Sequence, residues 1–254
     1  MTFPEAILVL AAAFAAGAIN AVAGGGSLVS FPALLAAGYP AKPANVTNTV
    51  ALWPGYLGGS LAYRPELRRQ RRRVALLVAP SVLGAIAGSA ILLATPGDTF
   101  EEIVPFLILF AAALLVFQDR LAQFAQAHRL ASQAGDHVPF VLHAAMFALA
   151  IYGAYFGAGL GIMTIAVLAV LLPDDIQHSN ALKGMLSLLI NAAAVVYFAA
   201  FGPVRWGPAA LMAGGALAGG YLGVGVARRL GPRWLRLAIV AYAVVVALVL
   251  LFDS

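Results

Sequence analysis

Apolar residues occur in long runs separated by short polar stretches, and the runs fall into two sets of five. The first set covers Glu5–Ala23, Ser27–Ala37, Asn45–Tyr63, Val74–Ala94 and Ile103–Phe117. The second set covers Val138–Phe156, Leu160–Leu172, His178–Phe201, Trp206–Ala227 and Leu235–Phe252. A helix needs roughly 20 apolar residues to cross the hydrocarbon core of a bilayer. The pattern therefore predicts an all-α integral membrane protein.

The two sets repeat the same order of long and short runs at an offset of about 135 residues, which is typical of an internal duplication. Local motifs match as well: Gly17-Ala18 with Gly153-Ala154, the glycines at 24–26 with those in the segment 157–161, and Ala44-Asn45-Val46 with Ser179-Asn180-Ala181. We therefore predict a first transmembrane repeat at 1–117, a cytoplasmic linker at 118–137 and a second repeat at 138–254, all within one membrane domain. Internal repeats in a membrane protein are typical of transporters.

The composition supports this interpretation and excludes several other classes of protein. Apolar residues make up 63% of the chain and charged residues 10%, against about 25% charged residues in an ordinary soluble domain. Too few charges exist to cover a water-soluble globule. Because the chain has no cysteine, disulfides, iron–sulfur clusters and thiolate zinc sites are excluded.

The basic residues predict the orientation. The six arginines between Arg64 and Arg73 place that segment, predicted to be a loop, on the cytoplasmic side of the membrane. If the halves have inverted topology, 12 basic residues lie in cytoplasmic loops and two in external loops, whereas parallel halves give nine and five. Inverted repeats are therefore favoured. The count of basic residues does not show whether the first two runs each cross the membrane fully or form a re-entrant hairpin, because both arrangements place the loops on the same sides. The net charge of +5 does not indicate nucleic-acid binding, because the charge lies in these loops.

Two glycine-rich interruptions predict broken or re-entrant helices at mid-membrane. Gly24-Gly25-Gly26 precedes Ser27 in the first half, and Gly159-Leu160-Gly161 occupies the matching place in the second half. Irregular backbone at membrane depth is tolerated where it is buried or lines a cavity. A helix that begins there presents free amide hydrogens and the positive end of its dipole, which favour an anion. The alternative is that the glycines only permit close helix packing.

Polar side chains near these interruptions are further candidates for anion binding. Lys183 is the only basic residue inside an apolar run, where a lysine costs on the order of 3 kcal/mol. Either an anionic ligand compensates this charge, or the side chain extends to the membrane surface. Asn20 precedes the first interruption, and Asn45, Asn48 and Asn180 open the third run of each half. The alternative for these amides is hydrogen bonding between neighbouring helices.

The chain contains none of the common motifs for catalysis or nucleotide binding. No Gly-Lys-Ser/Thr follows a glycine run, and no His-Glu-x-x-His, Gly-x-Ser-x-Gly or pair of carboxylates lies in an apolar run. We therefore expect no enzymatic activity, no cofactor, no metal and no nucleic-acid partner.

Several motifs together resemble one known family. They are Gly17-Ala18-Ile19-Asn20-Ala21-Val22-Ala23-Gly24-Gly25-Gly26-Ser27, Phe31-Pro32, Ala44-Asn45-Val46-Thr47-Asn48, Pro54-Gly55-Tyr56-Leu57-Gly58-Gly59, Gly157-Ala158-Gly159-Leu160-Gly161 and Asn180-Ala181-Leu182-Lys183. In this respect the whole chain resembles the TauE/SafE family of sulfite exporters. The resemblance implies an inner-membrane transporter that exports sulfite, sulfoacetate or a related sulfur-containing or organic anion.

These considerations together predict one substrate site between the two interruptions. The hydroxyls of Ser27 and Thr164 are placed to meet an oxyanion, and Asn48 stands near the position of Lys183, so only one half offers a fixed charge. The predicted substrate-binding residues are Asn20, Gly24, Gly25, Gly26, Ser27, Asn45, Asn48, Gly159, Gly161, Thr164, Asn180 and Lys183. The expected partners are a small anion, the lipid bilayer and a second copy in a homodimer. A passive anion channel and a non-transporting membrane scaffold are the alternative functions.

Overall fold

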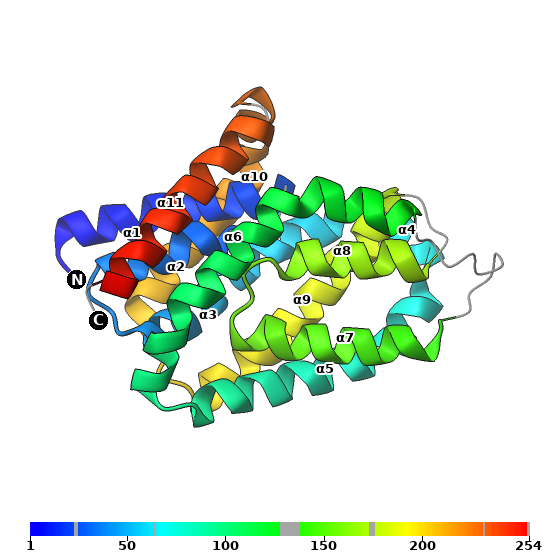
Figure 1. Cartoon of the computed structure of the whole chain (residues 1–254), viewed down its shortest axis with the longest axis horizontal. Coiled ribbons are helices and arrows are strands. Elements are labelled where there is room, and N and C mark those ends of the chain that lie inside the picture. Colours follow the sequence, from blue (N-terminus) through cyan, green and yellow to red (C-terminus); the bar gives the residue numbers. More distant parts are fainter. Residues whose placement is uncertain (23–24, 63, 128–137, 173–175, 231, 253–254) are drawn as a thin grey trace.

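The computed structural model describes residues 1–22, 25–62, 64–127, 138–172, 176–230 and 232–252, and these residues form helices without any strand (Figure 1). In the first half the helices are α1 (Phe3–Val22), α2 (Ser27–Ala36), α3 (Ala41–Ala62), α4 (Arg64–Arg69), α5 (Arg71–Ala94) and α6 (Gly97–Ala127). In the second half they are α7 (Phe140–Tyr155), α8 (Leu160–Leu171), α9 (Ile176–Phe201), α10 (Trp206–Leu230) and α11 (Pro232–Phe252). The prediction of an all-helical protein is confirmed.

Helix lengths separate membrane-crossing helices from short ones. Among the described residues, four helices are long and apolar enough to cross a membrane: α1, α5, α6 and α9. The short helices α2 and α8 have 10 and 12 residues. At about 1.5 Å per residue, each covers roughly half of a hydrocarbon core about 30 Å thick. The two short apolar runs therefore form separate short helices, as the sequence predicts.

Helices of the two halves pack against each other in a reciprocal pattern. Helix α1 lies along α10, helix α5 lies along α7, and α3 packs on α9 (Figure 1). Small residues permit this approach, because a Cβ atom on Gly17 would overlap the carbonyl oxygen of Ala216, and one on Gly84 would overlap that of Phe147. The first helix of each half thus packs tightly on the third long helix of the other half.

One predicted segment is wrong in its local structure. The arginine-rich segment Arg64–Arg73 is helical, not a loop, because it forms α4 and the first turn of α5. Arg, Glu, Leu and Gln favour helix, and Pro65 is at the first turn, where proline is tolerated. Helix α6 also continues to Ala127, into the predicted linker, because charge does not end a helix outside the hydrocarbon core. Residues 128–137 lie outside the described residues.

Candidate functional site

The first helix break joins α1 to α2, and a side chain of α1 closes it. Gly25 has φ +92° there, a conformation that favours glycine. Asn20 Oδ1 accepts a hydrogen bond of 2.8 Å from the Gly26 N–H. A Cβ atom on Gly26 would overlap the carbonyl oxygen of Ala16, so the break folds back against α1. The predicted break is confirmed, and Gly24 lies outside the described residues.

The second helix break joins α7 to α8, and two glycines form it. Gly157 and Gly159 have φ +80° and +81°. The Tyr152 hydroxyl donates a 2.6 Å hydrogen bond to the carbonyl oxygen of Ala158. This second predicted break is also confirmed, and its polar support comes from a tyrosine hydroxyl where the first break uses an asparagine.

Helix α8 begins with an amide hydrogen that the protein does not use. The N–H groups of Ile162 and Met163 donate to the carbonyl oxygen of Gly159. The Gly161 N–H has no hydrogen-bond partner among the described residues. The first amides of a helix lack partners within the helix and carry its positive dipole end. This N–H is therefore available to a bound group.

Both breaks reach the same turn of α6. A Cβ atom on Gly25 would lie 4.0 Å from Leu115 Cδ1, and one on Gly159 would lie 3.0 Å from Leu114 Cδ1. The rings of Phe31 in α2 and Phe156 in the second break pack edge to face with centroids 5.6 Å apart. The structure therefore brings together two segments that are more than a hundred residues apart in the sequence.

Lys183 lies at the start of α8. A Cβ atom on Gly161 would be 3.8 Å from Lys183 Cδ, which is ordinary van der Waals contact. Lys183 Nζ donates a 3.2 Å hydrogen bond to Asn180 Oδ1, one turn earlier in α9. Within the described residues, no carboxylate lies within ion-pair distance of Nζ and no acceptor binds Asn180 Nδ2. Three donors therefore border the start of α8: the Gly161 N–H, Lys183 Nζ and Asn180 Nδ2.

The predicted amides of α3 have structural partners. Asn45 Nδ2 donates a 2.8 Å hydrogen bond to the carbonyl oxygen of Tyr155 and so ties α3 to the last residue of α7. Asn48 Oδ1 accepts a 2.6 Å hydrogen bond from Ser30 Oγ in α2. The alternative of hydrogen bonding between helices is thus correct for Asn45 and for the oxygen of Asn48.

Sequence reasoning missed Ser30, which is fully buried. The spacing from Gly25 to Gly159 provides the signal, because the same spacing relates Ser30 to Thr164. Both hydroxyls also lie near the carbonyl four residues back in their own helices: Thr164 Oγ1 donates to the Leu160 carbonyl at 2.8 Å, whereas Ser30 Oγ is 3.4 Å from the Gly26 carbonyl and donates its proton to Asn48 Oδ1. Ser27 is half-buried. Because its hydroxyl donates to the Leu160 carbonyl, Thr164 Oγ1 already has an acceptor within α8.

A comparison with known families identifies the class of protein. The family model described as "Sulfite exporter TauE/SafE" matches residues 9–250. The chain belongs to the TauE/SafE family. Relatives of similar length support this assignment, and each is named a probable membrane transporter protein.

One such TauE/SafE relative from Haemophilus influenzae is 27% identical, over 95% of this chain and 92% of its own length. A Sinorhizobium protein, named with the suffix ORF9, is 27% identical over 95% of this chain and 90% of its own length. The Escherichia coli K12 protein YfcA is 25% identical over 95% and 88%. This TauE/SafE chain is thus a multi-pass membrane transporter, as the sequence predicts.

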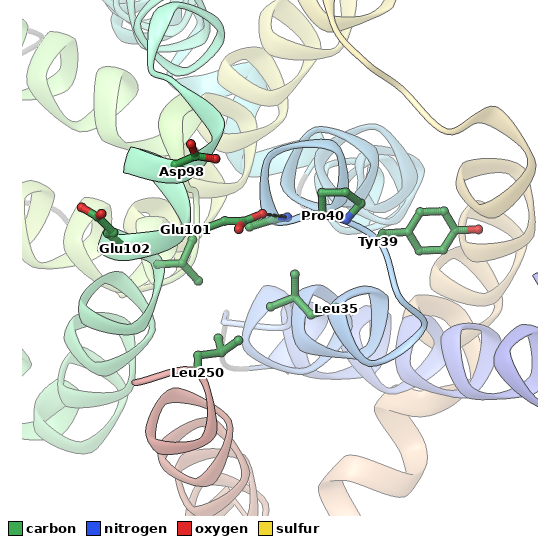
Figure 2. A pocket seen from close by; sticks show the side chains of 9 residues that line it. Leu35, Tyr39, Pro40, Asp98, Glu101, Glu102 and Leu250 are labelled. Carbon is green, nitrogen blue, oxygen red and sulfur yellow. Dashed lines mark hydrogen bonds between the residues drawn. The ribbon is translucent and has the colours of Figure 1, made fainter. Parts of the chain in front are cut away.

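A pocket of about 470 Å³ lies at one end of the TauE/SafE bundle, where α2, α6 and α11 meet the start of α3. Figure 2 shows Asp98, Glu101 and Glu102 on one side of it, facing Leu35 and Leu250. The last residue that α6 contributes to this pocket is Val104, and Ala111, seven residues further along α6, borders Gly159 in the second break. The pocket and the second break are therefore about 10 Å apart along the axis of α6. Carboxylates repel anions, so this pocket is distinct from the predicted anion site.

Proposed function

We propose that this transporter exports sulfite or a related small sulfur-containing or organic anion, and that the anion binds at the second helix break. The contact between Lys183 and Gly161 supports this proposal most directly. The aliphatic part of the lysine side chain passes beside the start of α8, and an ammonium near that positive dipole end is repelled by it unless an anion lies between or beside them. An oxyanion there would accept hydrogen bonds from Lys183 Nζ, Asn180 Nδ2 and the Gly161 N–H.

The remaining predicted site residues divide into two roles in this proposal. Asn20, Gly25 and Gly26 shape the first break, and Asn45 and Gly159 hold the second break against α3 and α6. Ser27, Asn48 and Thr164 supply polar groups around the path of the anion. The side chains that bind charge come from the second half, and those of the first half orient the backbone around them.

We further propose that the two halves are inverted repeats. The reciprocal packing of α1 on α10 and of α5 on α7 supports this topology. A second reciprocal contact does so too: Gln70, just before α5, donates to the His178 carbonyl in α9 at 3.0 Å. The Arg205 N–H, just before α10, donates to Thr47 Oγ1 in α3 at 3.0 Å. The arginine-rich segment Arg64–Arg73 lies on the cytoplasmic side of the inner membrane in this arrangement.

Export requires no coupling ion in this proposal. A monovalent anion that leaves a cell with a negative interior gains about 2.3 kcal/mol per 100 mV of membrane potential. The membrane potential alone therefore drives net efflux, provided that the site is alternately open to each side.

Efflux from proteoliposomes tests the proposal. Vesicles loaded with ³⁵S-labelled sulfite and clamped at a negative interior with potassium and valinomycin should release label in a saturable manner. Lys183→Met should abolish this flux, whereas Lys183→Arg, which keeps the charge, should retain part of it. The unfolding temperature of both variants in detergent is the control for folding.

Two outcomes would contradict the proposal. Unchanged sulfite efflux in a folded Lys183→Met variant would remove Lys183 from the site. Flux that does not saturate and that also conducts halides would identify a passive anion channel instead of a transporter.

A further inference from the structure

The two halves present different side chains at corresponding positions near the breaks. The offset of 135 residues that relates Asn45 to Asn180 also relates Asn48 in α3 to Lys183 in α9. Near the start of the short helices, Ser30 in α2 corresponds to Thr164 in α8. One half therefore offers a neutral amide where the other half offers an ammonium.

The neutral position has an unused hydrogen-bond donor. Asn48 is 2% exposed and Ser30 is 0% exposed, and Ser30 Oγ donates to Asn48 Oδ1 at 2.6 Å. This bond fixes the amide with its oxygen toward Ser30. Asn48 Nδ2 makes no hydrogen bond within the described residues. Asn48 Nδ2 is not among the side-chain atoms that are both fully buried and without a partner, so it is accessible, and a ligand oxygen is the group that would satisfy it.

Residues next to Asn48, and the Lys183 side chain itself, contact the second break. Asn48 lies one turn after Asn45, whose amide holds the Tyr155 carbonyl at one end of that break. Ser30 precedes Phe31, whose ring packs on Phe156 at the same end. Lys183 lies at the other end of the break, against Gly161. The contacts of its neighbours therefore place Asn48 near one end of the six-residue segment 156–161, and the Lys183 side chain lies near the other end.

We propose that Asn48 makes the site selective for anions with a single negative charge. This inference rests on the anion-export function proposed above. Lys183 takes the one charge, and Asn48 Nδ2 donates to an oxygen that carries no full charge. A dianion would leave one negative charge uncompensated at membrane depth, where charged groups are strongly disfavoured. Hydrogensulfite and small alkanesulfonates fit this description, whereas sulfate and sulfoacetate carry two charges at neutral pH.

Competition by anions of different charge tests the selectivity of the wild-type protein. Methanesulfonate, which carries one charge at every working pH, should inhibit ³⁵S-sulfite efflux at concentrations about a hundredfold lower than sulfate, the ratio that an uncompensated membrane charge implies. Sulfite efflux should also fall as pH rises and hydrogensulfite loses its proton, while methanesulfonate efflux should not change. Equal inhibition by sulfate and methanesulfonate would overturn the inference.

Variants of Asn48 test the assignment to that residue. Asn48→Lys adds a second ammonium and should shift the preference toward sulfate by at least about tenfold. Because a buried lysine can prevent folding, Asn48→His provides a milder test: its preference for sulfate should rise as acidification charges the imidazole. Asn191→His is the matched control, because Asn191 lies in the same pair of packed helices and its amide bonds within α9, to the Ser187 carbonyl at 2.8 Å.

The outcomes separate this inference from the export proposal. If wild-type vesicles release neither sulfite nor methanesulfonate, the export function itself is wrong. If they release sulfite and sulfate equally well, export stands and monoanion selectivity is wrong. If Asn48→His and Asn191→His shift the preference equally, the effect is a general one of membrane charge and Asn48 does not determine specificity.

Discussion

The two helix breaks share a backbone design but differ in how their polar groups are used. In the first break, the Gly26 N–H donates to Asn20 Oδ1 and Ser30 Oγ donates to Asn48 Oδ1, while the Ser27 N–H has no partner among the described residues. In the second break, the Gly161 N–H has no partner among the described residues, and Lys183 lies beside it. Within the described part of the chain, each short helix thus begins with a free amide hydrogen, and the breaks differ in the side chains beside it: a lysine at the second break, and neutral asparagine and serine side chains at the first.

The largest expected contrast concerns the glycines that follow each break. Gly26→Ala would place a Cβ atom on the carbonyl oxygen of Ala16, and backbone cannot move aside as a side chain can. We expect it to lose roughly 3 kcal/mol of unfolding free energy or to fail to fold. Gly161→Ala meets Lys183 Cδ at 3.8 Å and should change stability by less than about 1 kcal/mol. Thermal unfolding in detergent measures both, and equal stability would contradict the packing described.

A smaller contrast concerns the two corresponding hydroxyls. Ser30→Ala removes the donor to Asn48 Oδ1 and leaves a buried amide oxygen without a partner, which should cost about 1–3 kcal/mol. Thr164→Ser keeps the hydroxyl that bonds within α8, and it should cost less than about 1 kcal/mol. Unfolding temperatures of the two variants, compared with the wild type, test this difference. A larger loss in Thr164→Ser than in Ser30→Ala would mean that the two breaks do not differ in this way.

The smallest contrast separates stability from binding. Asn20→Ala removes the cap on the Gly26 N–H and should lower the unfolding free energy by about 1 kcal/mol. Asn180→Ala removes an amide that faces Lys183 and should raise the half-saturating sulfite concentration about tenfold with a smaller loss of stability. Efflux kinetics and unfolding temperature are measured on the same preparations. A greater loss of sulfite affinity in Asn20→Ala than in Asn180→Ala would indicate that the anion binds at the first break instead.

The sequence predicts the positions of both breaks, because glycine runs inside apolar segments are rare local signals. It also predicts Lys183 as a site residue, because a lone basic residue inside an apolar run requires compensation. It does not predict that Asn45 binds the Tyr155 carbonyl, since that contact depends on how α3 and α7 align in space. Ser30 was missed because serines are common in membrane helices and only the exact offset between the halves marks it.

The helical content outside the apolar runs was also beyond hydropathy analysis. The segment Arg64–Arg73 is too polar to enter the hydrocarbon core, and hydropathy therefore marks it as a connection. Its residues nevertheless favour helix, so the chain stays helical as α4 and the start of α5. Hydropathy predicts which residues lie in the hydrocarbon core, whereas helix propensity determines how far a helix continues beyond it.

Binding of sulfite to the purified protein tests most directly whether the second break holds the anion. A ligand that binds only the folded state stabilises it by about 2.7 kcal/mol at one hundred times its dissociation constant. Sulfite should therefore raise the unfolding temperature of the wild type and of Asn191→His, and it should leave that of Lys183→Met unchanged. An equal rise in Lys183→Met would show that the anion binds elsewhere and would contradict the account.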